Sequence, residues 1–383
     1  MKLIIQPDDG VTPLLAAIRG AKKRIDIAIF RADRKDIENG LNAAAARGVK
    51  VTALIAHVNR GGADNLRKLE IRFLEAGVIV ARTADDLVRY HDKFLLIDRR
   101  VLYVLSFNYT HLDIDHSRGF GIITTNAAWV REGIKLFGAD CTRSTYKSGT
   151  DSFVVSPANS RKVLGAFLRR AKKQLLIYDP KISDKEMLRI LQERAKAGVE
   201  IRIIGKVGAN FQFDSQRLAG QRLHTRTIIR DGRQAFIGSQ SMRPAELDSR
   251  RELGLIIHDA KAVKKLADIF EADWVPAESK KEKPESKEKK AQQRAADTAE
   301  EKVEKAEQKE QEQTEKQAQV AVKALKQELD PLAATVKKAV RKAVAKAGED
   351  VLKDKGVKNT MKRVVKKAVK EAVKEAVQES NGA

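Results

Sequence analysis

The stretch AKKRIDIAI at residues 21–29 decides the fold, because the chain repeats it as AKKQLLIYD at residues 171–179. The segment RGVKV at 47–51 recurs at the same offset of 150 residues, as AGVEI at 197–201. Internal repetition is informative before any single motif, because each copy of a long repeat forms one structural unit. The sequence therefore predicts two homologous halves.

Each copy has the pattern of an α/β unit. Leu14 and Ile18 lie at helical spacing ahead of an apolar strand expected at 24–30. Gly48 and Gly198 occupy positions where the end of a helix favours a residue that tolerates positive φ. Strands that alternate with helices predict a mixed, largely parallel sheet flanked by helices in each half. We expect the active site at the seam between the halves.

The distribution of aromatic residues sets the outer boundary of the folded part. The last aromatic residue is Trp274, and the 109 residues after it contain none, so that segment has little with which to build a core. We divide the chain into a first half at 1–150, a second half at 151–275 and a lysine-rich tail at 276–383. Valines at every fourth position from 365 to 377 predict a mostly helical or disordered tail.

The charge of the chain indicates polyanionic partners. The net charge is +23, and residues 281–383 carry 26 basic and 19 acidic side chains, a net of +7. The remaining +16 lies in the part expected to fold. Such a balance favours a phosphate-bearing substrate, nucleic acid or an anionic membrane surface. The tail is expected to bind DNA or anionic surfaces, and a solvated spacer is the alternative.

The composition also indicates a compartment. A single cysteine, Cys141, excludes an internal disulfide framework and fits a reducing environment. The apolar run at 3–5 is far shorter than a signal-peptide core, and no stretch is apolar enough for a membrane span. The sequence predicts a cytoplasmic protein, peripheral to a membrane or nucleoid where its tail binds one.

The chemistry is expected to reside in two related motifs. The first half contains HDKFLLID at 91–98, the pattern HxKxxxxD, and the second contains HTRTIIRD at 224–231, the pattern HxRxxxxD. Each is followed by an apolar strand and a small polar cluster, SFN at 106–108 and GSQS at 238–241. A lone histidine beside an apolar run is usually a packing residue. Two matches at corresponding places in a duplicated chain are hard to assign to chance.

The residue types in these motifs suit phosphoryl transfer. Side chains two positions apart on a strand share a face, so His91 with Lys93, and His224 with Arg226, can meet one phosphate. One histidine can attack phosphorus while the other exchanges protons with the leaving group and the acceptor. Hydroxyl and amide groups can stabilise the developing charge. The candidate phosphate-binding residues are Ser106, Asn108, Ser239 and Ser241.

The paired motifs resemble the HKD signature of phospholipase D, cardiolipin synthase and related phosphodiesterases. The resemblance covers about residues 1–275 and does not extend to the tail. It implies cleavage of a phosphodiester by double displacement through a phosphohistidine, with no metal and no cofactor. Because both half-sites lie in one chain, a monomer can hold the complete site.

The sequence departs from the family pattern in its second motif, where Arg226 replaces lysine. It keeps the charge as a wider, planar donor suited to a bidentate grip on phosphate. A second departure concerns the acid that the family carries eleven positions after the asparagine of its polar cluster. Counting from Ser241, which replaces that asparagine in the second half, gives Glu252, whereas counting from Asn108 gives Gly119.

These departures divide the roles of the two histidines. The resemblance implies that Glu252 crosses the seam to orient His91 and to stabilise its cationic form. His224 lacks the matching acid unless Asp113 or Asp115 substitutes for it. We therefore expect His91 to be the nucleophile and His224 the general acid and base.

The motif aspartates are expected to be structural. Asp98 and Asp231 follow their histidines by seven positions, an odd number, so on a straight strand they face the other way. The dipeptide at 231–232, Asp-Gly, is also typical of a hairpin turn. The remaining histidines are weaker candidates, since no spacing among them completes a metal-ligand set. They are His57, His111, His116 and His258.

Three functions remain open from the sequence. The leading interpretation is a phospholipase D-type hydrolase or phosphatidyltransferase acting on a phospholipid head group, because duplication within one chain is common among the lipid-acting members of the family. A metal-independent endonuclease or other nucleic-acid phosphodiesterase is favoured by the basic charge. The third interpretation is a degenerate, non-catalytic polyanion-binding protein, suggested by Gly119, Arg226 and Ser241.

Overall fold

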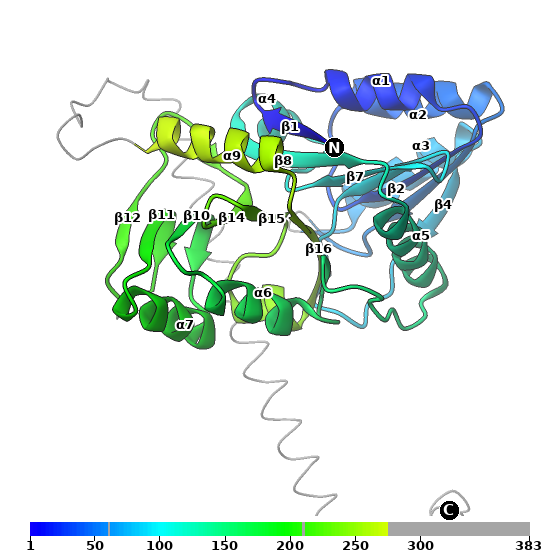
Figure 1. Cartoon of the computed structure of the whole chain (residues 1–383). Helices are drawn as coiled ribbons and strands as arrows, with labels where there is room; N and C mark the ends of the chain where they lie inside the picture. Colours follow the sequence, from blue (N-terminus) through cyan, green and yellow to red (C-terminus); the bar gives the residue numbers. More distant parts are fainter. Residues whose placement is uncertain (60–61, 209–210, 275–383) are drawn as a thin grey trace, which may run out of the picture. The chain divides into compact units, whose positions relative to one another are not determined.

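The computed structural model describes residues 1–59, 62–208 and 211–274, all within one compact unit (Figure 1). The predicted tail at 276–383 lies outside the described residues, so its expected helical or disordered character stays a prediction. Among the helices of the described part, none is long and apolar enough to span a membrane.

The first half forms one sheet with the strand order β1-β8-β7-β6-β2-β3-β4. Its strands are β1 (Lys2–Gln6), β2 (Arg24–Ile29), β3 (Lys50–Ile55), β4 (Ile79–Arg82), β6 (Phe94–Ile97), β7 (Val101–Leu105) and β8 (Ser117–Thr124). Its helices are α1 (Thr12–Gly20), α2 (Lys35–Ala46), α3 (Asp64–Glu75), α4 (His111–Asp115) and α5 (Ala127–Thr142).

The second half repeats this arrangement, with the strand order β12-β11-β10-β14-β15-β16 and β9 paired to β16. Its strands are β9 (Phe153–Ser156), β10 (Gln174–Ile182), β11 (Glu200–Val207), β12 (Asp214–Gln216), β14 (Arg226–Arg230), β15 (Gln234–Gly238) and β16 (Arg250–Ile257). Its helices are α6 (Ser160–Arg169), α7 (Lys185–Lys196), α8 (Pro244–Asp248) and α9 (Ala260–Asp273).

The duplication read from the sequence is confirmed as two α/β halves. Gly48 and Gly198 both follow a helix with positive φ, +86° and +85°, as the helix ends require. Within the described residues, the second half has no counterpart of α3, and for that reason the offset falls from 150 residues at the first strands to 133 at the histidine motifs. The proposed boundary between residues 150 and 151 stays a prediction.

The sheets are mixed, but the expectation that they are largely parallel is wrong. Among the described strands of the first half, β2–β3 and β3–β4 are parallel, while the other four pairs are antiparallel. The reason is a tight turn within each motif. Asp98 and Arg99 have φ of 51° and 53°, and Asp231 and Gly232 have φ of 54° and 62°. Such left-handed pairs reverse the chain, so each motif strand forms a hairpin with the next strand.

Two short strands cross the seam between the halves. β5 (Arg89–Tyr90) belongs to the first half but pairs with β16, and β13 (Arg222–Leu223) belongs to the second half but pairs with β8. The next backbone N–H groups continue these crossings, from His91 to the Arg251 carbonyl at 2.7 Å and from His224 to the Arg118 carbonyl at 3.1 Å. Each histidine therefore directly follows a short strand that pairs with the sheet of the other half.

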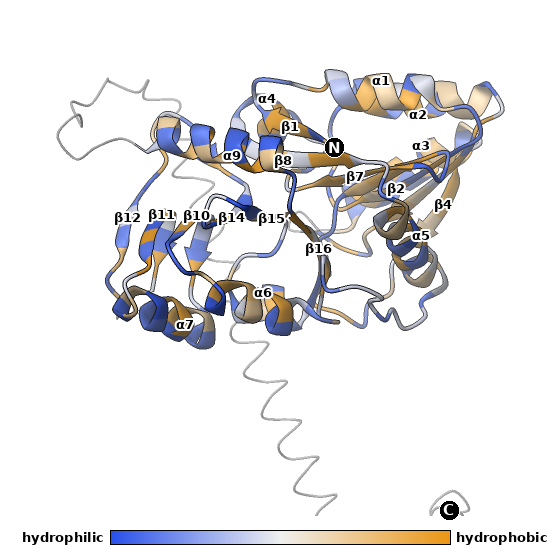
Figure 2. Ribbon diagram, in the orientation of Figure 1, coloured by the Kyte–Doolittle hydropathy of each residue, from blue (hydrophilic) through white to orange (hydrophobic). Residues whose placement is uncertain are grey.

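Helices cover both faces of each sheet (Figure 1). α1 and α2 lie along one face of the first sheet and α5 along the other, while α6, α7 and α9 flank the second sheet. Along α7 and α9, hydrophilic and hydrophobic residues alternate as in amphipathic helices (Figure 2). The central core takes residues from both halves. For example, the rings of Phe120 on β8 and Tyr178 on β10 meet edge to face at 5.6 Å.

Candidate active site

The first motif places His91 and Lys93 in the link between β5 and β6. Both side chains contact the ring of Phe30, His91 edge to face at 4.6 Å and Lys93 Nζ at 5.4 Å from the centroid. The intervening Asp92 instead interacts with Asp140 and Arg251. His91 and Lys93 therefore share a face, as their spacing predicts.

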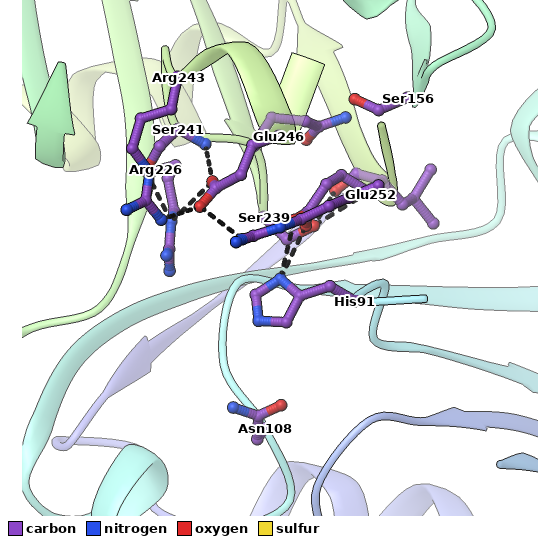
Figure 3. Close-up of polar contacts among 12 residues, drawn as sticks. His91, Asn108, Ser156, Arg226, Ser239, Ser241, Arg243, Glu246 and Glu252 are labelled. Carbon is purple, nitrogen blue, oxygen red and sulfur yellow. Dashed lines mark hydrogen bonds and ion pairs between the residues drawn. The ribbon is translucent and has the colours of Figure 1, made fainter. Parts of the chain in front are cut away.

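Glu252 reaches His91 from the second half. Its two carboxylate oxygens lie 3.0 and 2.9 Å from His91 Nδ1, and the imidazole lies between Glu252 and Asn108 in Figure 3. Glu252 is fully buried on β16, where its carboxylate also accepts a hydrogen bond from Ser239. Burial, together with the charge of Glu246, raises the pKa of Glu252 to about 8. In the tautomer that carries its proton on Nδ1, His91 donates to this carboxylate and has its lone pair on Nε2.

Lys93 is a buried cation at the same seam. The side chain is fully buried, and Nζ has no hydrogen-bond partner among the described residues. Burial lowers the pKa of Lys93 to about 7, opposed by the charge of Glu252 and assisted by that of Arg226. A buried ammonium group without a direct partner is costly, and an anion beside it removes much of that cost. An anion bound beside Lys93 would therefore favour the protonated form of its amine.

The second motif places His224 just ahead of β14. The side chain is buried, its Nε2 lies 3.5 Å from Asp113 Oδ2, and its Nδ1 has no hydrogen-bond partner among the described residues. Burial lowers the pKa of His224 well below its usual value, and the cations Arg222 and Arg226 lower it further, while Asp113 opposes them. Burial and the neighbouring cations therefore disfavour the protonated imidazole, and the charge of Asp113 favours it.

Arg226 uses part of its guanidinium within the protein. Its Nε donates to the Ser241 hydroxyl at 3.2 Å, and one terminal nitrogen donates to the His224 carbonyl at 2.7 Å. These bonds fix the plane of the guanidinium beside His224. The acceptor of the first bond, Ser241, occupies the position that Asn108 has in the first half.

The two serines that begin the polar clusters bond to the strands that follow them. The hydroxyl of Ser106 accepts from the Phe120 amide at 2.9 Å, and that of Ser239 accepts from the Leu253 amide at 3.1 Å. Both side chains are fully buried. Their part in binding phosphate stays a prediction, and in this structure their hydroxyls hold β8 and β16 beside the motifs.

Asn108 connects the first cluster to Asp113. Its backbone and side-chain N–H groups both donate to Asp113 Oδ2, at 2.9 and 2.6 Å. Asp115, the other acid considered as a partner of His224, pairs instead with Arg34 at 2.6 Å and with His111 at 3.0 Å. Of the two alternatives for the missing acid, Asp113 is the one at His224.

The structure explains the missing acid at position 119. A Cβ atom added at Gly119 would lie 3.0 Å from the ring of Phe107, tighter than ordinary van der Waals contact. At the corresponding place in the second half, Gln240 occupies the position of Phe107 and Glu252 that of Gly119. Where the second half has a buried carboxylate, the first half therefore has a glycine packed against an aromatic ring.

The motif aspartates have structural contacts. The carboxylate of Asp98 accepts backbone N–H groups of residues 22–24, and that of Asp231 accepts those of residues 172–174. Burial alone would raise the pKa of both groups, but these donors hold the pKa of each below its usual value. The contacts support the interpretation that both anchor the loops before β2 and β10.

Sequence reasoning missed a buried cluster around Glu246. This fully buried carboxylate accepts the Ser241 amide at 2.5 Å, pairs with Arg250 at 2.9 Å and also pairs with Arg243. The signal was present in the sequence, since Glu246 follows Ser241 by five positions just as Asp113 follows Asn108. Among the described residues, no group of three or more His, Cys, Asp or Glu side chains could hold a metal ion.

The charges of the two motifs act on one another across the seam. Lys93 interacts electrostatically with Glu252 and Arg226 of the second half, and His224 interacts with Asp113 and Lys93 of the first. The arrangement combines an imidazole held by a carboxylate, a second imidazole and two basic side chains, Lys93 and Arg226. Such a set can neutralise and attack a phosphoryl group.

Two solved structures resemble this chain in fold. Polyphosphate kinase from Porphyromonas gingivalis aligns with a TM-score of 0.59 and 22% identity, over 70% of this chain and 46% of that protein. Phosphatidylserine synthase from Haemophilus influenzae Rd KW20 aligns with a TM-score of 0.56 and 12% identity, over 71% of this chain and 85% of that protein. The chain spans less than half of the polyphosphate kinase. At these identities the likeness concerns the fold alone.

A sequence search of curated proteins found no match. The family described as "Cardiolipin synthase, PLD-like domain" matches residues 14–141 and 164–274, which together exceed half of the chain. The two matched ranges fall in the two halves and include both histidine motifs. The chain therefore belongs to the cardiolipin synthase-type family of phospholipase D-like proteins.

Proposed function

We propose that this protein is a phospholipase D-type phosphodiesterase that hydrolyses or transfers a phospholipid head group through a phosphohistidine on His91. The observation that carries the proposal is the His91 imidazole, which Glu252 holds at 2.9 Å from across the seam beside the buried cation of Lys93. A histidine that only packed would not need a buried carboxylate and a buried ammonium group together.

The first step forms the covalent intermediate. His91 Nε2 attacks phosphorus with its lone pair, a P–N bond forms, and the bond to the leaving oxygen breaks. The leaving alkoxide takes a proton from His224 in its protonated form. Glu252 stabilises the positive charge on His91, while Lys93 and Arg226 neutralise the phosphoryl oxygens.

The second step releases the product. Water, or an acceptor alcohol, gives a proton to His224 and attacks phosphorus. The P–N bond breaks, and its electron pair returns to His91 Nε2. The same residues thus serve hydrolysis and transfer, and the acceptor that reaches the site decides between them.

Two observations favour a lipid substrate. The matching family is described by the name cardiolipin synthase, and the fold resembles that of a phosphatidylserine synthase. Nucleic acid is the second candidate, because the chain has a net charge of +23 and the larger part of it lies outside the tail.

The test is a comparison of substrates. Purified full-length protein is incubated with phosphatidylcholine vesicles and with plasmid DNA, in excess chelator, beside His91→Ala. We expect release of choline by the wild type, no release by the variant, and a phosphohistidine at residue 91. Nicking of the plasmid without lipid turnover would replace the lipid with nucleic acid as the substrate. Covalent label on His224 would reverse the roles of the two histidines.

A further inference from the structure

The two histidines differ in how a carboxylate reaches them. His91 has both oxygens of Glu252 within hydrogen-bond distance of Nδ1. At the equivalent position for His224 the chain has Gly119, and the ring of Phe107 packs into the space a side chain would need. A histidine that must gain and lose protons during the reaction requires some other group to hold it.

Asp113 is the carboxylate that the structure brings to His224. It lies on α4, in the opposite half from His224, and its Oδ2 is 3.5 Å from Nε2. That separation suits an ion pair with a protonated imidazole rather than a hydrogen bond to a neutral one. The other oxygen of Asp113 accepts from Arg222 at 2.8 Å, which fixes the carboxylate in place.

The charges around His224 make the Asp113 carboxylate important for protonation of the imidazole. The charged groups that act on the imidazole are Arg222 on β13, Arg226 on β14, Lys93 ahead of β6 and Asp113 on α4. The three cations disfavour protonation of His224, and Asp113 favours it. Without Asp113, a buried imidazole among three cations would gain a proton with difficulty.

We propose that Asp113 is the positioning residue of His224. It holds this imidazole as Glu252 holds that of His91, but it comes from a different place in the chain. It holds Nε2 and leaves Nδ1, which has no partner among the described residues, to exchange protons. The carboxylate comes five positions after Asn108, instead of the eleven that separate Ser241 from Glu252. The inference rests on the proposed function for the part that concerns the reaction.

Glu246 offers a matched control for the structural part of this arrangement. It follows Ser241 as Asp113 follows Asn108, and its Oε2 accepts the Ser241 amide as Asp113 Oδ2 accepts that of Asn108. Its charged partners are arginines, however, and the structure shows no contact between Glu246 and a histidine among the described residues. Asp113→Asn and Glu246→Gln thus remove the same kind of local support, but only the first removes the carboxylate that contacts the His224 imidazole.

The first measurement needs no substrate. The pKa of His224 is followed by NMR of full-length protein with ¹⁵N-labelled histidine, assigned with His224→Gln. We expect Asp113→Asn to lower this pKa, because the favourable charge is lost, while Asp113→Glu restores it in part and Glu246→Gln leaves it in place. An unchanged pKa in Asp113→Asn, or an equal fall in both amide variants, would overturn the proposal whatever the substrate proves to be.

The second measurement uses two lipids that differ in the leaving group. Phosphatidylcholine releases an alcohol that needs a proton, and phosphatidyl-p-nitrophenol releases a weakly basic phenolate that needs none. We expect Asp113→Asn to slow single-turnover choline release about 100-fold, with little change in nitrophenolate release. Equal slowing of both would show a structural role only. Failure of the wild type on both lipids would count against the proposed function, and the NMR result would still decide the inference.

Discussion

Glu252 and His91 lie 161 residues apart in the chain, and the carboxylate oxygens of the first are 3.0 and 2.9 Å from Nδ1 of the second. The bond crosses from β16 of the second sheet to the link between β5 and β6 of the first. The orientation of the proposed nucleophile therefore depends on how the two halves pack, because the imidazole and its carboxylate come from different halves.

The first prediction concerns that pair. Glu252→Gln should lower kcat by about 10²–10⁴-fold, because the amide can no longer stabilise the imidazolium and can hold His91 in the wrong tautomer. The measurement is steady-state turnover on the proposed phospholipid substrate, with the yield of phosphohistidine at residue 91. Thermal unfolding of the variant serves as the control for folding. Retention of more than about a tenth of the wild-type kcat would show that the carboxylate does not orient the nucleophile.

The second prediction concerns Lys93, whose ammonium group is buried. Lys93→Met should abolish activity yet raise the free energy of unfolding by about 1–4 kcal/mol at neutral pH, because an apolar side chain avoids desolvating a charge. Urea unfolding of the full-length protein measures the difference.

The pH dependence of this effect has a definite sign. The pKa of Lys93 is lowered from 10.5 to about 7, so the folded state disfavours the proton that the unfolded chain binds. The gain from Lys93→Met should be absent above about pH 10.5, grow as the pH falls toward 7, and stay level below that. A gain that is independent of pH would show that packing, and not the buried charge, causes the stabilisation.

The repeat and the paired motifs were enough to predict two α/β halves with the motif histidines at their seam. Periodicity fixes the face on which a side chain lies, and for that reason His91 and Lys93 were correctly placed together. The alternation of strands and helices predicted the wrong strand directions, because the turns at Asp98 and Asp231 reverse the chain within each motif. The Asp-Gly dipeptide at 231–232 already indicated one of these hairpins. Contacts between segments that are distant in the sequence were harder to predict than the strand directions.

The partner of His224 shows where sequence reasoning stopped. Asp113 and Asp115 were equivalent alternatives in the sequence, and the short helix α4 decides between them. It directs Asp113 to His224, while Asp115 pairs with Arg34. The reason for a glycine at position 119 could not be predicted from the sequence either. Its close contact with Phe107 depends on the packing of β8 against the preceding loop.

The third prediction concerns the motif aspartates. Asp98→Asn keeps a residue that tolerates positive φ, here 51°, but weakens the anchoring of three backbone N–H groups. We expect a loss of about 1–3 kcal/mol in the free energy of unfolding, with kcat of the folded protein changed less than about threefold.

This loss also has a predicted pH dependence. The pKa of Asp98 is held below 3.8, so its contribution to stability is present above pH 3.8 and fades as the pH falls through the folded-state value. The difference between wild type and Asp98→Asn should therefore shrink in acid. Asp231→Asn, with the corresponding contacts, should behave in the same way, and a large fall in kcat with normal stability would indicate a role in the chemistry.

The fourth prediction concerns metals. In the proposed mechanism Lys93 and Arg226 neutralise the phosphoryl group, so turnover should persist in excess EDTA. The measurement compares initial rates before and after extensive chelation, with a metal-dependent phosphodiesterase as the positive control for the chelator. Loss of activity that a divalent cation restores would contradict the mechanism proposed here.

The last prediction concerns residues 276–383, which lie outside the described part of the chain. All proposed catalytic residues come before position 260, whereas the tail concentrates lysine and contains no aromatic residue. Truncation after Pro276 should leave turnover of a small soluble phosphodiester within about twofold, while the full-length protein binds DNA or anionic vesicles more tightly. That advantage should fall steeply with salt, because lysine contacts to phosphates release counterions. DNA should be preferred, since the apolar residues at 365–377 are alanine and valine, which insert weakly into a bilayer. Equal affinity of both proteins for both polyanions would show that the tail is a spacer.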